Sequence, residues 1–163
     1  MKLTRFIPTA LLLITAALGA IGVFAQPMKL DHWTPAQLME RAQHLKQVAA
    51  QGDGSASETL DKYPRHFTML AFRNRTGGGE LHQNYADLFY ILDGHATVVT
   101  GGQMDNPKTT AAGEIRGTAV SGGSRQDVAA GDVVHIPAGT PHQMVLPEGG
   151  TVTYFVVKIQ EKD

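Results

Sequence analysis

The segment GDVVHIPAGTPH, from Gly131 to His142, carries the strongest fold signal in the chain. The Gly-Asp pair at its start predicts a turn, and the apolar and β-branched residues that follow predict a short strand. Pro137 and Gly139 then predict a chain reversal, because proline presets its φ angle and glycine accepts conformations closed to other residues. The direction of His142, at the head of the next strand, is therefore well determined.

A second segment, ELHQNYAD, runs from Glu80 to Asp87 between a glycine-rich run (76–79) and an apolar run (88–94). Glu80 and His82 alternate, so on a β-strand their side chains point to the same side. Asp87 follows at the head of the next strand-like run. Two histidines and one or two carboxylates that converge inside a small barrel would form a first-row transition-metal site with open positions.

Short strands separated by Gly and Pro fill the chain after Gly52. Asp93-Gly94 predicts a hairpin turn between two of them. Residues 101–124, rich in Gly, Thr and Ala, form either an ordered excursion near a site or a flexible loop. The expected strands span residues 66–75, 88–92, 95–100, 132–137, 142–146 and 151–159. Such a series after one helix is typical of an all-β barrel or sandwich.

One amphipathic helix is expected before the strands. Thr34 is its predicted N-cap, with Pro35 at the first helical position, Gln37 completing a capping box and Gly52 after the last turn. The apolar stripe at 3.6-residue spacing is Leu38, Ala42, Leu45 and Ala49. His44, outside this stripe, is expected at the surface.

The first 25 residues have the pattern of an export signal. Lys2 and Arg5 precede an apolar stretch that ends in a small residue, Ala25. The alternative is a membrane anchor, because residues 7–25 are nearly long enough to span a bilayer, although Pro8 interrupts them. We expect a cleaved signal, a mature chain of residues 26–163 without stable membrane insertion, and a periplasmic or secreted location.

Composition excludes several classes of function. The chain has no cysteine, which excludes disulfides, thiolate metal sites and cysteine nucleophiles. Without Lys2 and Arg5, the 14 basic residues become 12 against 15 acidic ones, a net charge of 12 − 15 = −3. With no basic run and few aromatic residues, a nucleic-acid partner is not expected. There is also no G-x-S-x-G elbow and no phosphate-binding P-loop.

The two segments resemble the motifs of the cupin superfamily, and the resemblance covers roughly residues 65–158. The second motif, G-x5-P-x-G-x2-H, is matched in full by Gly131, Pro137, Gly139 and His142. Leu146 stands where the family usually has Asn, a common departure.

The first cupin motif, G-x5-H-x-H-x(3,4)-E-x6-G, is met only in part. Gly94 and the spacing before it match, and Asp87 falls where the family has Glu. His82 takes the place of the second histidine, and Glu80 replaces the first. The replacement of the first histidine by Glu80 therefore changes one of the residues that bind the metal in the family.

The resemblance implies a cupin barrel (a double-stranded β-helix, or jelly roll) at residues 56–163, after a helical lead-in at 26–55. It implies a divalent transition metal (Fe, Mn, Zn or Ni) held by His82, Asp87 and His142. Glu80 is then either a fourth ligand or a general base beside the metal. The opposing possibility is a polar interior without metal.

Small cupins include dioxygenases, isomerases and lyases, so the resemblance implies a metal-dependent enzyme acting on a small oxygen-rich molecule. The alternative is a noncatalytic protein that binds a sugar or organic acid. A homodimer formed through barrel faces is a family expectation. Tyr85, Tyr90 and Gln143 are the candidate residues of the substrate pocket. Three histidines, His66, His95 and His135, are expected to lie outside the site. Glu114 and Arg116 are expected to form a solvated ion pair, with a place at the entrance of a pocket as the alternative.

Overall fold

A computed structural model describes residues 30–162, so the predicted export signal at 1–25 lies outside the described part of the chain. Within residues 30–162, no helix is long and apolar enough to cross a membrane. The elements are α1 (Pro35–Gln51), β1 (Ser55–Lys62), β2 (His66–Arg73), β3 (Gly79–His82), β4 (Tyr85–Thr100), β5 (Gln103–Asp105), β6 (Lys108–Ala111), β7 (Glu114–Gly117), β8 (Ala119–Ser121), β9 (Ser124–Ala129), β10 (Val133–Ile136), β11 (His142–Val145) and β12 (Val152–Gln160).

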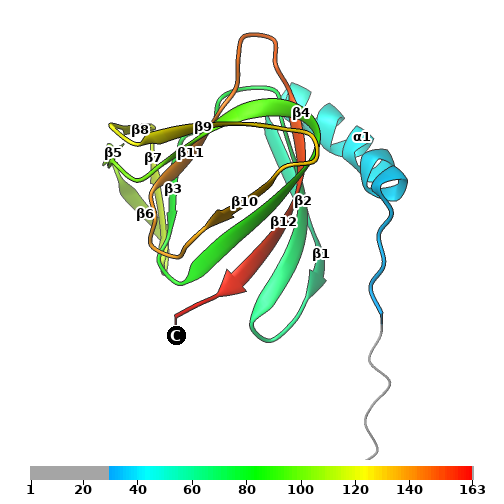
Figure 1. The fold of residues 1–163 in the computed structure, drawn as a ribbon, viewed down its shortest axis with the longest axis horizontal. Coiled ribbons are helices and arrows are strands. Elements are labelled where there is room, and N and C mark those ends of the chain that lie inside the picture. The colour runs from blue at the N-terminus through cyan, green and yellow to red at the C-terminus, as the bar shows by residue number, and fades with distance from the viewer. Residues whose placement is uncertain (1–29, 163) are drawn as a thin grey trace, which may run out of the picture. The chain divides into compact units, whose positions relative to one another are not determined.

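Helix α1 begins as its capping residues predict. The Gln37 backbone N–H donates to Thr34 Oγ1 at 3.2 Å, and the Thr34 backbone N–H donates to Gln37 Oε1 at 2.9 Å, which completes the capping box. The apolar stripe of the helix is buried against Leu70 and Phe72 of β2. In Figure 1, α1 lies outside the strands, beside β1 and β2. The helix therefore covers the outer face of this part of the sheet.

Ten of the twelve described strands form one curled antiparallel sheet in the order β1-β2-β12-β4-β11-β3-β7-β6, with β9 and β10 also paired to β4, and β5 and β8 form a separate pair. Figure 1 shows the strands bent around a common interior. The first half of β4 pairs with β12 and β10, and its second half pairs with β9 and β11. This arrangement confirms the expected all-β jelly-roll barrel with an N-terminal helix.

The hairpin predicted at Asp93-Gly94 is wrong. Strand β4 runs through this dipeptide for 16 residues; β12 pairs with it as far as Gly94, and β9 pairs with it from His95 onward. The register shifts here, because Asp93 faces Thr153 while Ile91 faces the next residue of β12. Gly94 has a φ of 81°, and a Cβ on it would clash with the carbonyl oxygen of Thr151. The glycine therefore serves a β-bulge that bends the strand, rather than a chain reversal.

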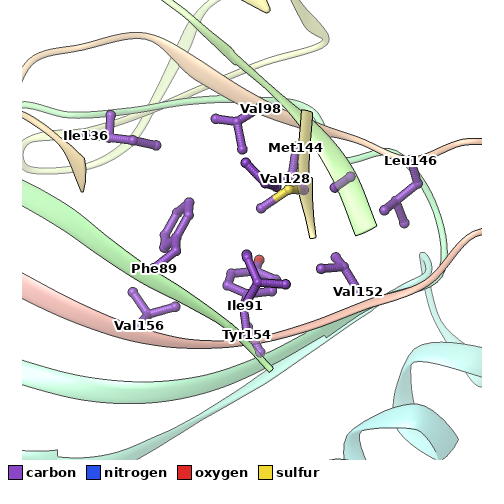
Figure 2. Packing of buried hydrophobic residues seen from close by; sticks show 12 residues of the cluster. Phe89, Ile91, Val98, Val128, Ile136, Met144, Leu146, Val152, Tyr154 and Val156 are labelled. Atoms are coloured by element: carbon purple, nitrogen blue, oxygen red, sulfur yellow. The ribbon is translucent and has the colours of Figure 1, made fainter. Parts of the chain in front are cut away.

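The apolar core fills the barrel interior next to the candidate site. Figure 2 shows side chains from facing strands pointing toward one another, with Phe89, Ile91 and Tyr154 among them. The Phe89 ring stands edge-on to Tyr154 at a centroid distance of 5.2 Å. On its other side it lies 6.5 Å from the ring of His142. Phe89 thus marks the border between the core and the polar residues.

The excursion at residues 101–124 is ordered and lies against β3. It forms two antiparallel pairs, β5 with β8 and β6 with β7, and β7 also pairs with β3. A Cβ on Gly78 would lie 2.5 Å from the carbonyl oxygen of Gly117, and one on Gly79 would lie 2.8 Å from that of Ala119. The glycine-rich run before Glu80 thus permits an approach that larger residues would prevent.

Candidate metal centre

Three strands bring the candidate ligands to one place. Glu80 and His82 lie on β3, Asp87 lies near the start of β4, and His142 begins β11. His142 pairs directly with Glu80 across the two strands. The turn before His142 is also tied to β3, since the Gly139 backbone N–H donates to the carbonyl oxygen of His82 at 2.7 Å. The Pro-x-Gly reversal therefore fixes His142 relative to His82.

Both histidines use Nδ1 for an outer hydrogen bond. His82 Nδ1 lies 2.7 Å from Glu114 Oε2, and His142 Nδ1 lies 3.0 Å from the carbonyl oxygen of Thr140. Carboxylate and carbonyl oxygens only accept, so these partners assign the proton to Nδ1 and leave a lone pair on Nε2. Each Nε2 is buried and has no hydrogen-bond partner within residues 30–162.

The lone pairs of the two Nε2 atoms face carboxylates, an arrangement that favours a bound cation. Asp87 Oδ2 lies 3.4 Å from each Nε2 atom, and Glu80 Oε2 lies 3.6 Å from His82 Nε2. One potential donor atom each from Glu80, His82 and His142 lie within 4.8 Å of one another. Donors about 2.1 Å from a four-coordinate ion lie about 3.4 Å apart, so these residues fit a first-row divalent metal.

Each carboxylate is also held by a cation through its other oxygen. Arg73 Nη2 donates to Glu80 Oε1 at 2.7 Å, and Arg73 Nε donates to the hydroxyl of Tyr154 at 3.1 Å. Lys158 Nζ lies 2.5 Å from Asp87 Oδ1. Both salt bridges are largely screened from solvent, with side-chain exposures of 24% or less. Arg73 and Lys158 thus fix the orientation of the two carboxylates, and the second oxygen of each remains directed toward the histidines.

Both carboxylates are held ionised. Burial by itself would raise the pKa of Glu80, but the charges of Arg73 and Arg116 outweigh it and hold the pKa well below its ordinary value. Burial likewise opposes ionisation of Asp87, whereas the charge and hydrogen bond of Lys158 lower its pKa. At neutral pH both therefore offer negatively charged oxygen donors.

A cavity of about 500 Å³ adjoins the candidate site. The four candidate ligands line it: Glu80, His82, Asp87 and His142. Its size suits a small molecule. Much of its wall is apolar. The apolar lining residues are Ala56, Phe67, Met69, Ala71, Phe72, Phe89, Val98, Met144 and Val156.

Two of the three predicted pocket residues line the cavity. Tyr85 and Gln143 do so, and Gln143 also accepts from the Val120 backbone N–H at 3.0 Å and donates to the Gly77 carbonyl oxygen at 2.7 Å. Tyr90 instead lies on the outer surface, 42% exposed. Its neighbours Phe89 and Ile91 face the interior, so alternation turns Tyr90 outward.

The excursion supplies two site residues that sequence reasoning treated as a solvated pair. Glu114 contacts His82, and Arg116 Nη2 lies 3.1 Å from Glu114 Oε2. Arg116 Nη1 lies 3.7 Å from Glu80 Oε2. Glu114 and Arg116 alternate along β7 as Glu80 and His82 do along β3. This alternation was the only sign in the sequence that the two side chains point to the same face of a strand. The pairing of the two strands is not readable from either segment alone.

Comparison with known proteins supports the fold. No model of a known protein family matches the chain, and no curated protein matches it by sequence. The structure of KdgF from Halomonas sp. is similar, with a TM-score of 0.50 and 15% identity over 69% of this chain and 84% of that one. The Schizosaccharomyces pombe Cnp3 cupin domain gives a TM-score of 0.50 and 11% identity over 66% of this chain and 65% of that one. At such identities the likeness concerns the fold alone.

Proposed function

We propose that this chain, which has the fold of the cupin superfamily, binds one divalent transition metal and acts on a small oxygen-rich molecule in the adjoining cavity. His82, His142, Glu80 and Asp87 would hold the metal. The observation that supports this most is the pair of buried Nε2 atoms that face ionised carboxylates without a hydrogen-bond partner in the described chain. Leaving such atoms unsatisfied costs free energy, which a bound cation would recover.

The reaction we propose is of the dioxygenase type or of the isomerase or lyase type. A bound ion of this kind would supply Lewis acidity toward a substrate oxygen that joins the four protein ligands. Neutral imidazoles and carboxylates accept Fe, Mn, Zn or Ni, so the donor set leaves the metal open. The chain's own contribution is to exclude water with apolar walls such as Phe89 and Met144, and to fix the donors in direction.

The charges around the cavity support an acidic substrate. Among the described residues that line it, three cations and three carboxylates sum to 3 − 3 = 0. They are Arg73, Arg116, Lys158, Glu80, Asp87 and Glu114. With neutral imidazoles, a divalent ion would leave a charge of about +2 in a partly apolar cavity, where uncompensated charge is costly. A carboxylate or enolate group on the substrate would offset it.

Metal content tests the proposed function directly. We expect the protein, purified without chelator or added metal, to contain close to one equivalent of Fe, Mn, Ni or Zn per chain by elemental analysis. Dialysis against a chelator should remove the metal, and one equivalent should return on addition of the same ion. A protein that contains no metal and takes up none of the four would contradict the proposal. Export and homodimer formation remain predictions.

Glu80 is proposed as a metal ligand rather than a general base. Its pKa is held well below the ordinary value, which makes it a weak base, and Arg73 already occupies one of its oxygens. We expect Glu80→Gln to weaken metal affinity at least about 10-fold, because losing a ligand should cost no less than losing an outer partner. Chelator competition measures this.

The matched control for Glu80→Gln is Glu58→Gln. Glu58 makes a bidentate salt bridge to Arg41 at 2.8 Å on the surface and does not line the cavity, so the same change of charge should leave affinity unaltered. Unaltered affinity in Glu80→Gln itself would exclude the ligand role and return Glu80 to the role of base.

A further inference from the structure

We propose that Glu114, carried by the excursion at residues 101–124, is a positioning residue that holds His82 in its metal-binding form. This inference rests on the proposed function, since it concerns a ligand of the same site. Glu114 would not touch the metal in this role. It acts through the ring nitrogen of His82 that faces away from the other ligands.

The contact between the two side chains is short and protected. Glu114 Oε2 lies 2.7 Å from His82 Nδ1, and the side chains are 30% and 3% exposed. An ionised carboxylate accepts and cannot donate, so the proton sits on Nδ1 and the lone pair on Nε2. A carboxylate on the outer nitrogen also makes the inner nitrogen more basic and fixes the plane of the ring. Glu114 thus sets both the tautomer and the direction of His82.

The register of β3 and β7 places Glu114 directly opposite His82. His82 and Glu114 are direct partners across β3 and β7, and Glu80 and Arg116 are the next same-face pair along the two strands. Directly opposed side chains on one face of an antiparallel pair lie close enough to interact. One inserted strand therefore supplies a partner for each of the two site residues on β3.

Arg116 fixes Glu114 in turn. Its guanidinium lies between the two carboxylates, with Nη2 3.1 Å from Glu114 Oε2 and Nη1 3.7 Å from Glu80 Oε2. The same Glu114 oxygen that meets His82 therefore also meets a cation. This contact holds the Glu114 carboxylate in place beside Nδ1 of His82.

The excursion is held rigidly enough to position a side chain. The Gln143 side chain links the Val120 backbone N–H to the Gly77 carbonyl oxygen, which ties the end of the excursion to the start of β3. A Cβ on Gly78 would lie 2.5 Å from the carbonyl oxygen of Gly117, so Gly78 permits a close approach of the two backbones. His142, by contrast, is oriented by the carbonyl oxygen of Thr140 in its own turn. Glu114 therefore acts on one histidine only.

Two substitutions separate the charge of Glu114 from its hydrogen bond. In Glu114→Gln the amide oxygen still accepts from Nδ1 but the negative charge is lost, whereas Glu114→Ala removes both. We expect affinity for Zn²⁺ or Co²⁺ to fall about 10- to 100-fold in Glu114→Ala and by a smaller factor in Glu114→Gln. Chelator competition measures both, with Glu58→Gln as the remote control of equal charge change and thermal unfolding as the check on the fold.

The tautomer of His82 gives a readout that does not depend on metal. In the metal-free protein, ¹⁵N chemical shifts, assigned with a His82→Ala spectrum, should show the proton on Nδ1 of His82. They should show a mixture of tautomers in Glu114→Ala, with His142 unchanged. Wild-type affinity in a folded Glu114→Ala, or a proton on Nε2 of His82 in the wild type, would overturn the inference. If the wild type binds neither ion, the proposed function fails, and the ¹⁵N spectra alone decide whether Glu114 sets the tautomer.

Discussion

Replacing His142 with alanine is expected to abolish tight binding of a divalent metal. His142 is 5% exposed, its Nδ1 is held by the Thr140 carbonyl oxygen, and its Nε2 lies 3.4 Å from Asp87 Oδ2. The substitution removes one of two neutral donors, and no other described histidine lines the cavity besides His82. We expect affinity to fall by more than about 100-fold, beyond the usual effect of losing an outer partner.

Thermal unfolding with and without metal measures the same loss. A metal at 100 times its Kd stabilises a folded protein by about 2.7 kcal/mol, so the wild type should show a clear rise in Tm on metal addition. The rise should be absent in His142→Ala. The control is His135→Ala, because His135 lies on the adjoining strand β10 but points outward with a 51% exposed side chain. A metal-dependent rise in Tm that survives in His142→Ala would refute the assignment of the site.

Replacing Lys158 with methionine is expected to destabilise the metal-free protein by about 3–5 kcal/mol, the usual cost of leaving one member of a buried ion pair without its partner. The Lys158 and Asp87 side chains are 13% and 3% exposed, with Nζ 2.5 Å from Oδ1. Methionine keeps the apolar stem of lysine, so the main change is the loss of the charge. Urea unfolding in the presence of a chelator measures the free energy.

Two comparisons sharpen the Lys158 experiment. Removing both charges, as Lys158→Met with Asp87→Asn, should recover much of the lost stability, because the unpaired carboxylate is then gone. Adding metal to Lys158→Met should also recover part of it if Asp87 faces the ion. A loss below about 1 kcal/mol in Lys158→Met would instead class the pair with ordinary surface salt bridges.

The fold was predictable from sequence where the signals are local. The Pro-x-Gly reversal before His142 and the capping box at Thr34 each depend on residues within a few positions, and both are seen. Asp93-Gly94 is also a local signal, but a hairpin and a bulge both need a glycine with positive φ. Only the pairing of β12 across the dipeptide separates the two, and that pairing is a long-range property.

The candidate metal ligands were predictable from the sequence, but the residues that hydrogen-bond to them were not. Alternation and motif spacing pointed to Glu80 and His82. The same alternation, counted from Asp87, would have turned Tyr90 outward, so that misplacement was avoidable. Glu114 was not accessible in this way, because its contact with His82 joins residues 32 positions apart and depends on the register of a strand in an irregular stretch.

The bulge just before Gly94, between Ile91 and Asp93, has a consequence for the chemistry of the site. Strand β4 carries Asp87 before the bulge and pairs with His142 through Thr100 after it. The gap between these two donors therefore follows from the curvature of one strand. One part of the sequence supplies the donor atoms, and another part, the bulge, sets the distance between them. A change in this bend would alter the spacing of the donors without changing any ligand residue.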